Sequence, residues 1–177
     1  MKRLGRKIMY ESNWINFYLD RVEMKDKSII EDYHVVSYHR EGVTVIVENK
    51  NDEILFVEAY RYLLNSSEWE TPAGGTEKGE DILKTGEREV LEESGYYIKN
   101  LEYLFSYFPA SGSTDLKFHV LKAELDEEKE RKDFDTNEIA DVKWIKKDKV
   151  KDMIRNNEII DGLTLNGLMY YLFLDKQ

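Results

Sequence analysis

The sequence predicts an α+β fold, in which helices cover both faces of a mixed β-sheet as an α/β/α sandwich, with extra antiparallel strands at the N-terminus. Three observations support this prediction. Strand-like segments fill the first third of the chain, one helix with clear boundary signals lies in the middle, and two helical segments follow the last strand-like segment. A chain of 177 residues suits one ordinary domain with a sizeable core.

The N-terminal segments alternate between apolar and polar residues. Residues 14–24 and 31–38 alternate sufficiently to be strands. We therefore expect an N-terminal strand region over residues 1–40 and a main domain over residues 41–177. The main domain opens on an apolar run, VTVIV at residues 43–47, which is typical of a buried strand, and residues 54–60 form the next predicted strand after a turn.

A helix is predicted shortly after residue 80. Leu83, Val90 and Leu91 are seven and eight positions apart, so one helical face is expected to be apolar. Acidic residues at its start suit the positive end of the helix dipole, and Gly95 stands where a left-handed cap would end it. The rest of the chain is expected to form strands at 101–108, 117–125 and 142–145, a highly charged loop at 126–135, and helices at 147–156 and 163–174.

Three glutamates of this helix carry the chemical signal. Glu89 and Glu93 are four positions apart and Glu92 is three from Glu89, so all three are expected on one face. Like charges at this spacing repel, which destabilises the helix unless a cation lies among them. Carboxylate oxygens suit Mg²⁺ or Mn²⁺. The alternative is an ordinary solvated acidic face.

The loop before the helix favours the metal site over a solvated face. The segment WETPAGG begins as a strand that Pro72 ends, and Gly74 and Gly75 permit close approaches that a side chain would block. A strand, a glycine turn and a carboxylate-bearing helix would form a cradle for metal-bound phosphates, with Gly74 against the substrate.

Composition indicates a cytoplasmic enzyme acting on a small molecule. The chain has no cysteine, and its three histidines are scattered without a zinc-ligand spacing. The net charge of -10 argues against a nucleic-acid partner. No apolar stretch approaches a membrane span, and the first residues lack the apolar core of a signal peptide.

One continuous motif links these features to a known family. Residues 74–96 fit the pattern G-x5-E-x7-R-E-U-x-E-E-x-G-U, where U is a bulky apolar residue. This stretch resembles the signature of the Nudix hydrolases. The resemblance implies hydrolysis of a nucleoside diphosphate linked to another group, with Mg²⁺ or Mn²⁺ as cofactor.

The family resemblance also implies roles for individual residues. Metal ligands would be the backbone carbonyl of Ala73 and the side chains of Glu89 and Glu93. Glu92 would be the third glutamate of the site, either as a ligand of a second ion or as a hydrogen-bond acceptor behind the metal ligands. Glu80 and Arg88 would pair to brace the loop against the helix, and Gly95 would complete the motif. The general base would come from the acidic loop before the last strand; Glu138 is preferred, and Asp133 and Asp135 remain alternatives.

Beyond the motif, most of the chain resembles the ADP-ribose pyrophosphatase branch of the family. This implies a homodimer that exchanges its N-terminal strands, with Trp14 stacking on the base or packing at the interface. Arg61 would face the phosphates or the terminal sugar. The branch's usual proline after the motif is replaced by Ser111, beside Gly112 of the expected substrate turn, while a proline occurs at Pro109.

Other functions remain open at this point. The substrate could be GDP-mannose, a dinucleoside polyphosphate or a nucleoside triphosphate instead of ADP-ribose. A non-catalytic module that binds nucleotide sugars is a second class, although every acidic position of the motif is intact. An isopentenyl diphosphate isomerase is excluded, because it needs a cysteine nucleophile and the chain has none.

Overall fold

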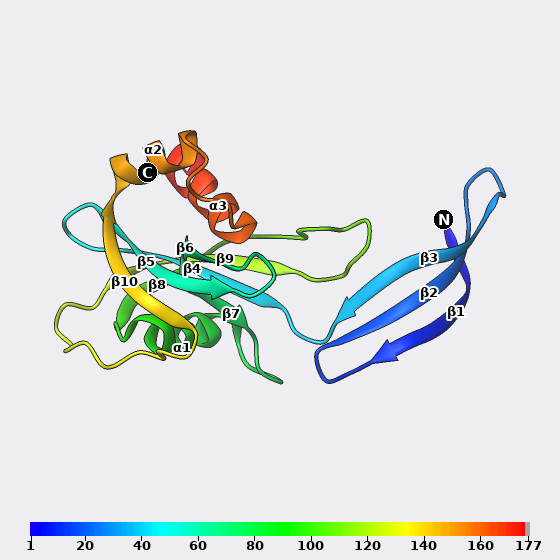
Figure 1. The fold of residues 1–177 in the computed structure, drawn as a ribbon, viewed down its shortest axis with the longest axis horizontal. Coiled ribbons are helices and arrows are strands. Elements are labelled where there is room, and N and C mark those ends of the chain that lie inside the picture. The colour runs from blue at the N-terminus through cyan, green and yellow to red at the C-terminus, as the bar shows by residue number, and fades with distance from the viewer. Residues whose placement is uncertain (176–177) are drawn as a thin grey trace. The chain divides into compact units, whose positions relative to one another are not determined.

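A computed structural model describes residues 1–175 of the chain, shown in Figure 1. The chain divides into two compact units. The first contains Met1–Glu41 and Tyr107–Lys117, and the second contains Gly42–Ser106 and Phe118–Gln177. The division proposed from the sequence placed all of residues 41–177 in one domain, whereas here an internal segment groups with the N-terminal strands.

The first unit is built on a three-stranded antiparallel sheet. Its order is β1-β2-β3, with β1 at Lys2–Glu11, β2 at Ile15–Glu23 and β3 at Ile29–Tyr38. The sequence did not predict β1, whose ten residues are all exposed. An edge strand without a buried face does not need alternating apolar and polar residues. The sequence of β1 therefore carries no periodic signal that would predict its pairing with β2.

Hydrogen bonds hold the segment Tyr107–Lys117 within the first unit. Asp115 accepts hydrogen bonds from the Ser37 hydroxyl at 2.6 Å and from the Tyr38 backbone N–H at 2.8 Å. The Tyr33 hydroxyl donates to the carbonyl of Gly112 at 2.6 Å. The turn containing Gly112 therefore belongs to the first unit together with β3.

The second unit contains a seven-stranded mixed sheet. Its main path is β10-β5-β4-β9-β8, with β6 paired to β5 and β7 paired to β4. Strands β4 and β9 are parallel and the other pairs with a defined register are antiparallel, which confirms the predicted mixed sheet. The strands are β4 Gly42–Glu48, β5 Glu53–Arg61, β6 Ser66–Glu70, β7 Ala73–Gly75, β8 Ile98–Tyr107, β9 Phe118–Leu125 and β10 Ile139–Lys146.

Helices lie on both faces of this sheet, as Figure 1 shows, so the predicted sandwich is confirmed. A side chain at Gly86 would meet Val45 and Leu121, whereas one at Gly167 would meet Val120 and Ile46. Adjacent residues of β4 and β9 thus face opposite helices. The helices are α1 Ile82–Ser94 on one face, and α2 Lys147–Arg155, α3 Gly162–Met169 and the π-helix η1 Tyr170–Leu174.

Side-chain and glycine caps define helix α1. The Asp81 carboxylate accepts from the backbone N–H of Leu83 at 2.9 Å. At the other end Gly95 has φ 72° and donates its N–H to Leu91. The prediction that Leu83 lies on the buried face of the helix is wrong, because its side chain is 37% exposed. The buried residues of α1 are Thr85, Gly86, Glu89, Val90 and Ser94.

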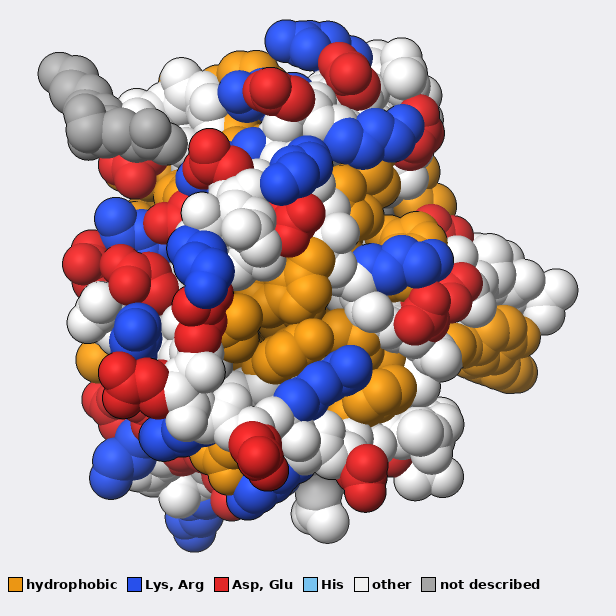
Figure 2. Space-filling model, turned by 90° about the vertical axis from the view of Figure 1, so that its left-hand side faces the viewer, with side chains coloured by type: hydrophobic (Ala, Val, Ile, Leu, Met, Phe, Trp, Pro, Cys, Tyr) orange, Lys and Arg blue, Asp and Glu red, His pale blue; other side chains and the backbone are white. Residues whose placement is uncertain are grey.

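The surface carries charges of both signs. On the face shown in Figure 2, basic and acidic side chains intermix around a central group of apolar ones. Within residues 1–175, no helix has the length and apolar character needed to cross a membrane.

Candidate active site

The loop before α1 lies tightly against the helix. The backbone N–H of Val45 donates to the carbonyl of Pro72 at 2.9 Å, and strand β7 then pairs antiparallel with β4. A Cβ atom added to Gly74 would lie 2.1 Å from the carboxyl carbon of Glu89. Only glycine permits this contact, so the loop and the Glu89 carboxylate share one packed surface.

Glu93 joins the same loop to the helix. Its Oε2 atom accepts a 3.0 Å hydrogen bond from the backbone N–H of Ala73. Burial raises the pKa of Glu93 to about 8, and the negative charges of Glu89 and Glu70 act in the same direction. The Ala73 N–H and the charge of Arg61 oppose this rise but do not cancel it. At this carboxyl, burial and the neighbouring negative charges therefore outweigh the positive charge of Arg61.

Arg88 connects four groups of the loop and helix. Its Nε and Nη2 atoms bind the two oxygens of Glu80, each at 3.0 Å, and Nη2 also donates to the carbonyl of Gly75 at 3.0 Å. Its Nη1 atom binds Glu89 at 2.8 Å and Glu92 at 3.0 Å. The Arg88 guanidinium lowers the pKa of Glu80 to about 2. The pair expected from the motif thus spans the loop and the helix.

The three motif glutamates differ in exposure. The Glu89 side chain is 12% exposed and that of Glu92 is 54% exposed, so Glu92 lies at the solvent edge of the face. Burial raises the pKa of Glu89, and Arg88 opposes the rise. Glu89 and Glu93 accordingly form the inner pair, and Glu92 lies outside them beside Arg88.

The donor set suits a hard divalent cation after local rearrangement. Within residues 1–175, no three acidic or histidine side chains converge closely enough to hold an ion, and Glu89 and Glu92 are both bound to Arg88. Yet Glu89 is buried and Glu93 is partly buried, and both carboxyls have raised pKa values next to a backbone loop. A cation would offset the negative charge of these carboxylates, and oxygen ligands are what Mg²⁺ and Mn²⁺ prefer.

Arg61 is held by an acid that the sequence reasoning missed. Its Nε donates to Glu70 Oε1 at 2.6 Å, and its Nη2 donates to the second oxygen of the same carboxylate. Glu70 is 3% exposed. Its hydrogen bonds raise the pKa of Arg61, and the charges of Asp161 and Glu93 act in the same direction. Arg61 is therefore a fixed cation near the inner carboxylates. The signal in the sequence that could have indicated this partner is Glu70 itself, the acid directly before the segment TPAGG.

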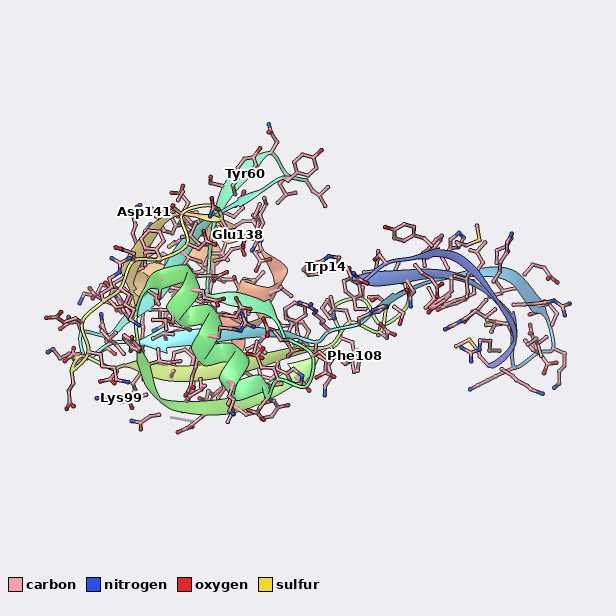
Figure 3. The ribbon with its side chains drawn as sticks, turned by 90° about the horizontal axis from the view of Figure 1, so that it is seen from below. Trp14, Tyr60, Lys99, Phe108, Glu138 and Asp141 are labelled. Carbon is pink, nitrogen blue, oxygen red and sulfur yellow. The ribbon has the colours of Figure 1, made fainter. Side chains whose placement is uncertain are left out.

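The acidic loop before β10 is anchored to the end of α1. The backbone N–H groups of Lys132 and Asp135 donate to the carbonyls of Gly95 and Glu92, at 2.9 Å and 2.8 Å. The Asp135 carboxylate is bound within the loop by Asn137. Glu138 is exposed next to β10, on the same side of the unit as Tyr60 in Figure 3. Asp133 is also exposed.

Trp14 and Gly112, the remaining expected substrate contacts, both lie in the first unit. Trp14 is 68% exposed, and the guanidinium of Arg40 lies 4.9 Å from the centre of its ring. A side chain at Gly112 would enter open space. Trp14 is thus a solvent-facing aromatic residue rather than part of the core of this unit.

The loop, the helix carboxylates and the arginine brace suit a hydrolase of phosphoanhydride bonds. Comparison with known families agrees: the NUDIX domain matches residues 38–163. The chain belongs to this family and is a Nudix hydrolase, an enzyme of small nucleotide substrates. Nudix hydrolases generally use divalent metal ions.

The relatives carry different names. The chain is 33% identical to the methanol dehydrogenase activator of Bacillus methanolicus over 75% of this chain and 72% of that protein. It is 26% identical to the ADP-ribose pyrophosphatase of Bacillus subtilis over 96% of this chain and 91% of that protein. A solved structure of an ADP compounds hydrolase has the same fold, with a TM-score of 0.83 at 17% identity, covering 96% and 91% of the two chains.

Proposed function

We propose that the protein hydrolyses the pyrophosphate bond of a nucleoside diphosphate sugar, with ADP-ribose, cleaved to AMP and ribose 5-phosphate, as the leading substrate. The observation that carries the reaction type is the pair Glu89 and Glu93, which packs against the Ala73–Gly75 loop. The substrate class is supported by similarity to an ADP-ribose pyrophosphatase over 96% of the chain.

The cofactor we propose is Mg²⁺ or Mn²⁺. The Ala73 carbonyl and the carboxylates of Glu89 and Glu93 would hold it, with Glu92 at the outer edge. A bound cation neutralises charge on the phosphate oxygens and favours ionisation of the attacking water. Arg88 orients Glu89 and Glu92 through its hydrogen bonds. Arg61, fixed by Glu70, supplies a positive charge that suits a phosphate group.

We assign the general base to Glu138. The carboxylate is exposed at the end of the anchored loop, whereas the carboxylate of Asp135 is bound to Asn137. A base must be free to accept a proton from water, which favours Glu138 over Asp135. Glu138 would take the proton as the water oxygen bonds to phosphorus and the bridging oxygen leaves.

We also propose a cytoplasmic homodimer in which Trp14 contacts the base of the substrate. The exposed strand β1 carries the apolar residues Leu4, Ile8, Met9 and Tyr10, each at least 40% exposed, which suits a covering partner. If Trp14 stacks on a base, Trp14→Ala should raise KM by the equivalent of roughly 1–3 kcal/mol. A monomer in sedimentation at micromolar concentration, with full activity, would rule out the dimer.

A turnover panel tests the function. It compares ADP-ribose, GDP-mannose, UDP-glucose, a dinucleoside polyphosphate and a nucleoside triphosphate with Mg²⁺ and with excess chelator. We expect ADP-ribose to have the highest kcat/KM and the chelator to abolish turnover. If another compound of the panel has a higher kcat/KM, that compound replaces ADP-ribose as the proposed substrate. Binding without any turnover would favour a non-catalytic module. In ¹⁸O-labelled water, one phosphate product must carry the label.

A further inference from the structure

The N-terminus of α3 contacts the chain just before the active-site loop. The Thr164 hydroxyl accepts a hydrogen bond from the backbone N–H of Thr71 at 3.1 Å, and the hydroxyls of the two residues are 3.4 Å apart. Asp161 caps the helix by accepting from the Thr164 backbone N–H at 2.7 Å. A residue 93 positions away therefore fixes the backbone two residues before Ala73.

Strand β4 holds the same residues from another side. The hydroxyls of Thr44 and Thr71 are 2.8 Å apart, and the Thr44 hydroxyl lies 3.4 Å from the carbonyl of Pro72. Thr44 is fully buried, and Thr71 and Thr164 are each 1% exposed. In such a site the Thr71 N–H needs an acceptor, because a buried donor without one destabilises the fold.

The position of this peptide determines the position of the candidate metal ligands. Ala73 follows Thr71 by two residues, and its N–H is the group that binds Glu93. With Pro72 between them, the chain has little freedom to absorb a displacement. A shift of Thr71 must then be passed on to the Ala73 carbonyl and to the Glu93 carboxylate.

We propose that Thr164 is a positioning residue of the active site: its hydroxyl fixes Thr71, and thereby the Pro72–Ala73 peptide, at the place where Ala73 meets Glu93. This rests on the proposed function. Thr164 does not touch the reacting atoms. Its side chain acts through hydrogen bonding, so an apolar residue of the same shape cannot replace it.

Two substitutions separate positioning from packing. Thr164→Val keeps the shape and removes the acceptor, and Thr164→Ser keeps the hydroxyl and removes a methyl group. We expect Thr164→Val to lower kcat roughly tenfold to a hundredfold, in line with the effect of small misplacements on catalysis. We also expect it to weaken Mn²⁺ binding in calorimetry. Thr164→Ser should retain kcat and Mn²⁺ affinity within about twofold of the wild type.

Tyr171→Phe is the matched control. The Tyr171 hydroxyl donates to Glu48, at the end of β4 away from Gly42, which pairs with the loop at Gly75. Its loss should lower Tm and leave kcat and Mn²⁺ affinity unchanged. If Thr164→Val lowers Tm alone, as the control does, or if Thr164→Ser is as defective as Thr164→Val, the positioning role is wrong. An inactive wild type that binds no Mn²⁺ overturns the proposed function together with this inference.

Discussion

Glu93 and Ala73 are joined by a 3.0 Å hydrogen bond from the backbone N–H of Ala73 to Oε2 of Glu93. It connects the loop with the last turn of α1, across 20 positions of sequence. The backbone carbonyl expected to bind metal and the carboxylate expected to bind metal thus belong to one hydrogen-bonded unit. A shift of either residue should therefore move both of these expected metal ligands.

The first prediction follows from this pair. Glu93→Gln and Glu89→Gln each keep the shape of the side chain and remove its charge. Each should lower kcat by about two orders of magnitude, which corresponds to about 3 kcal/mol of lost transition-state stabilisation. Circular dichroism should show both variants folded, because glutamine keeps the size of the side chain and an oxygen that can accept the hydrogen bonds of Ala73 and Arg88. Steady-state kinetics at saturating Mg²⁺ measures the effect.

Glu87→Gln is the control for this prediction. Glu87 lies on the opposite side of α1 from Glu89 and is exposed, so its charge is solvated. The kcat of the Glu87→Gln variant should match that of the wild type. Full wild-type activity in excess chelator would contradict the assignment of these carboxylates to a metal site.

The second prediction concerns the contact between Gly74 and Glu89. A methyl group on Gly74 would lie 2.1 Å from the Glu89 carboxyl carbon, so Gly74→Ala must displace the carboxylate or the loop. We expect kcat to fall about as far as in Glu89→Gln, since a misplacement of about 1 Å can cost a hundredfold in rate. Gly162→Ala, whose methyl group would enter open space, should retain wild-type kcat. Equal activity of the two alanine variants would show that the packing is not needed.

Local sequence signals predicted the helix that carries the site, and long-range contacts account for what was missed. Asp81 and Gly95 mark the ends of α1, and the resemblance of the motif to a known family implied the pairing of Glu80 and Arg88. By contrast, the contact of Thr164 with Thr71 joins small polar residues on separate elements, which produces no periodic pattern. The same is true of Glu70, whose burial depends on the whole sheet.

The C-terminal helix shows a second limit of the sequence. Residues 163–174 were predicted as one helix, yet α3 ends at Met169 and the chain continues as the π-helix Tyr170–Leu174. Over only five residues, the periods of an α-helix and a π-helix are too similar for the pattern of apolar residues to distinguish them. Tertiary contacts such as the Tyr171 hydroxyl on Glu48 are not encoded in that pattern.

The third prediction tests the general base. Glu138→Gln should lower kcat with little change in KM, because the lost proton acceptor acts in the transition state. Asp133→Asn and Asp135→Asn should have milder effects, and for Asp135 the reason is its engagement with Asn137. A crippled Asp135→Asn or Glu92→Gln beside an unaffected Glu138→Gln would move the base to that residue. A pH profile of kcat/KM should lose its acidic limb only in the variant that lacks the base.

The last prediction concerns the stability of the first unit against acid. Asp20, 5% exposed, accepts two hydrogen bonds of 2.7 Å from Arg6, and these lower the pKa of its carboxyl below the ordinary 3.8. A carboxyl with a lowered folded-state pKa stabilises the fold at pH values above its unfolded pKa. That contribution is lost as the pH falls through the folded value. Arg6→Gln should therefore lower the free energy of unfolding by about 1–3 kcal/mol at neutral pH.

The difference between wild type and Arg6→Gln should shrink as the pH falls below 3.8, because the carboxyl is then protonated in the unfolded chain and increasingly in the folded one. Urea unfolding across this range measures it. Arg21→Gln is the control, since Arg21 pairs with Glu31 on the exposed surface, where an ion pair contributes little. A difference between wild type and Arg6→Gln that stays constant down to strongly acidic pH would mean that Arg6 stabilises the sheet by packing over the Tyr18 ring, 4.0 Å away, rather than through Asp20.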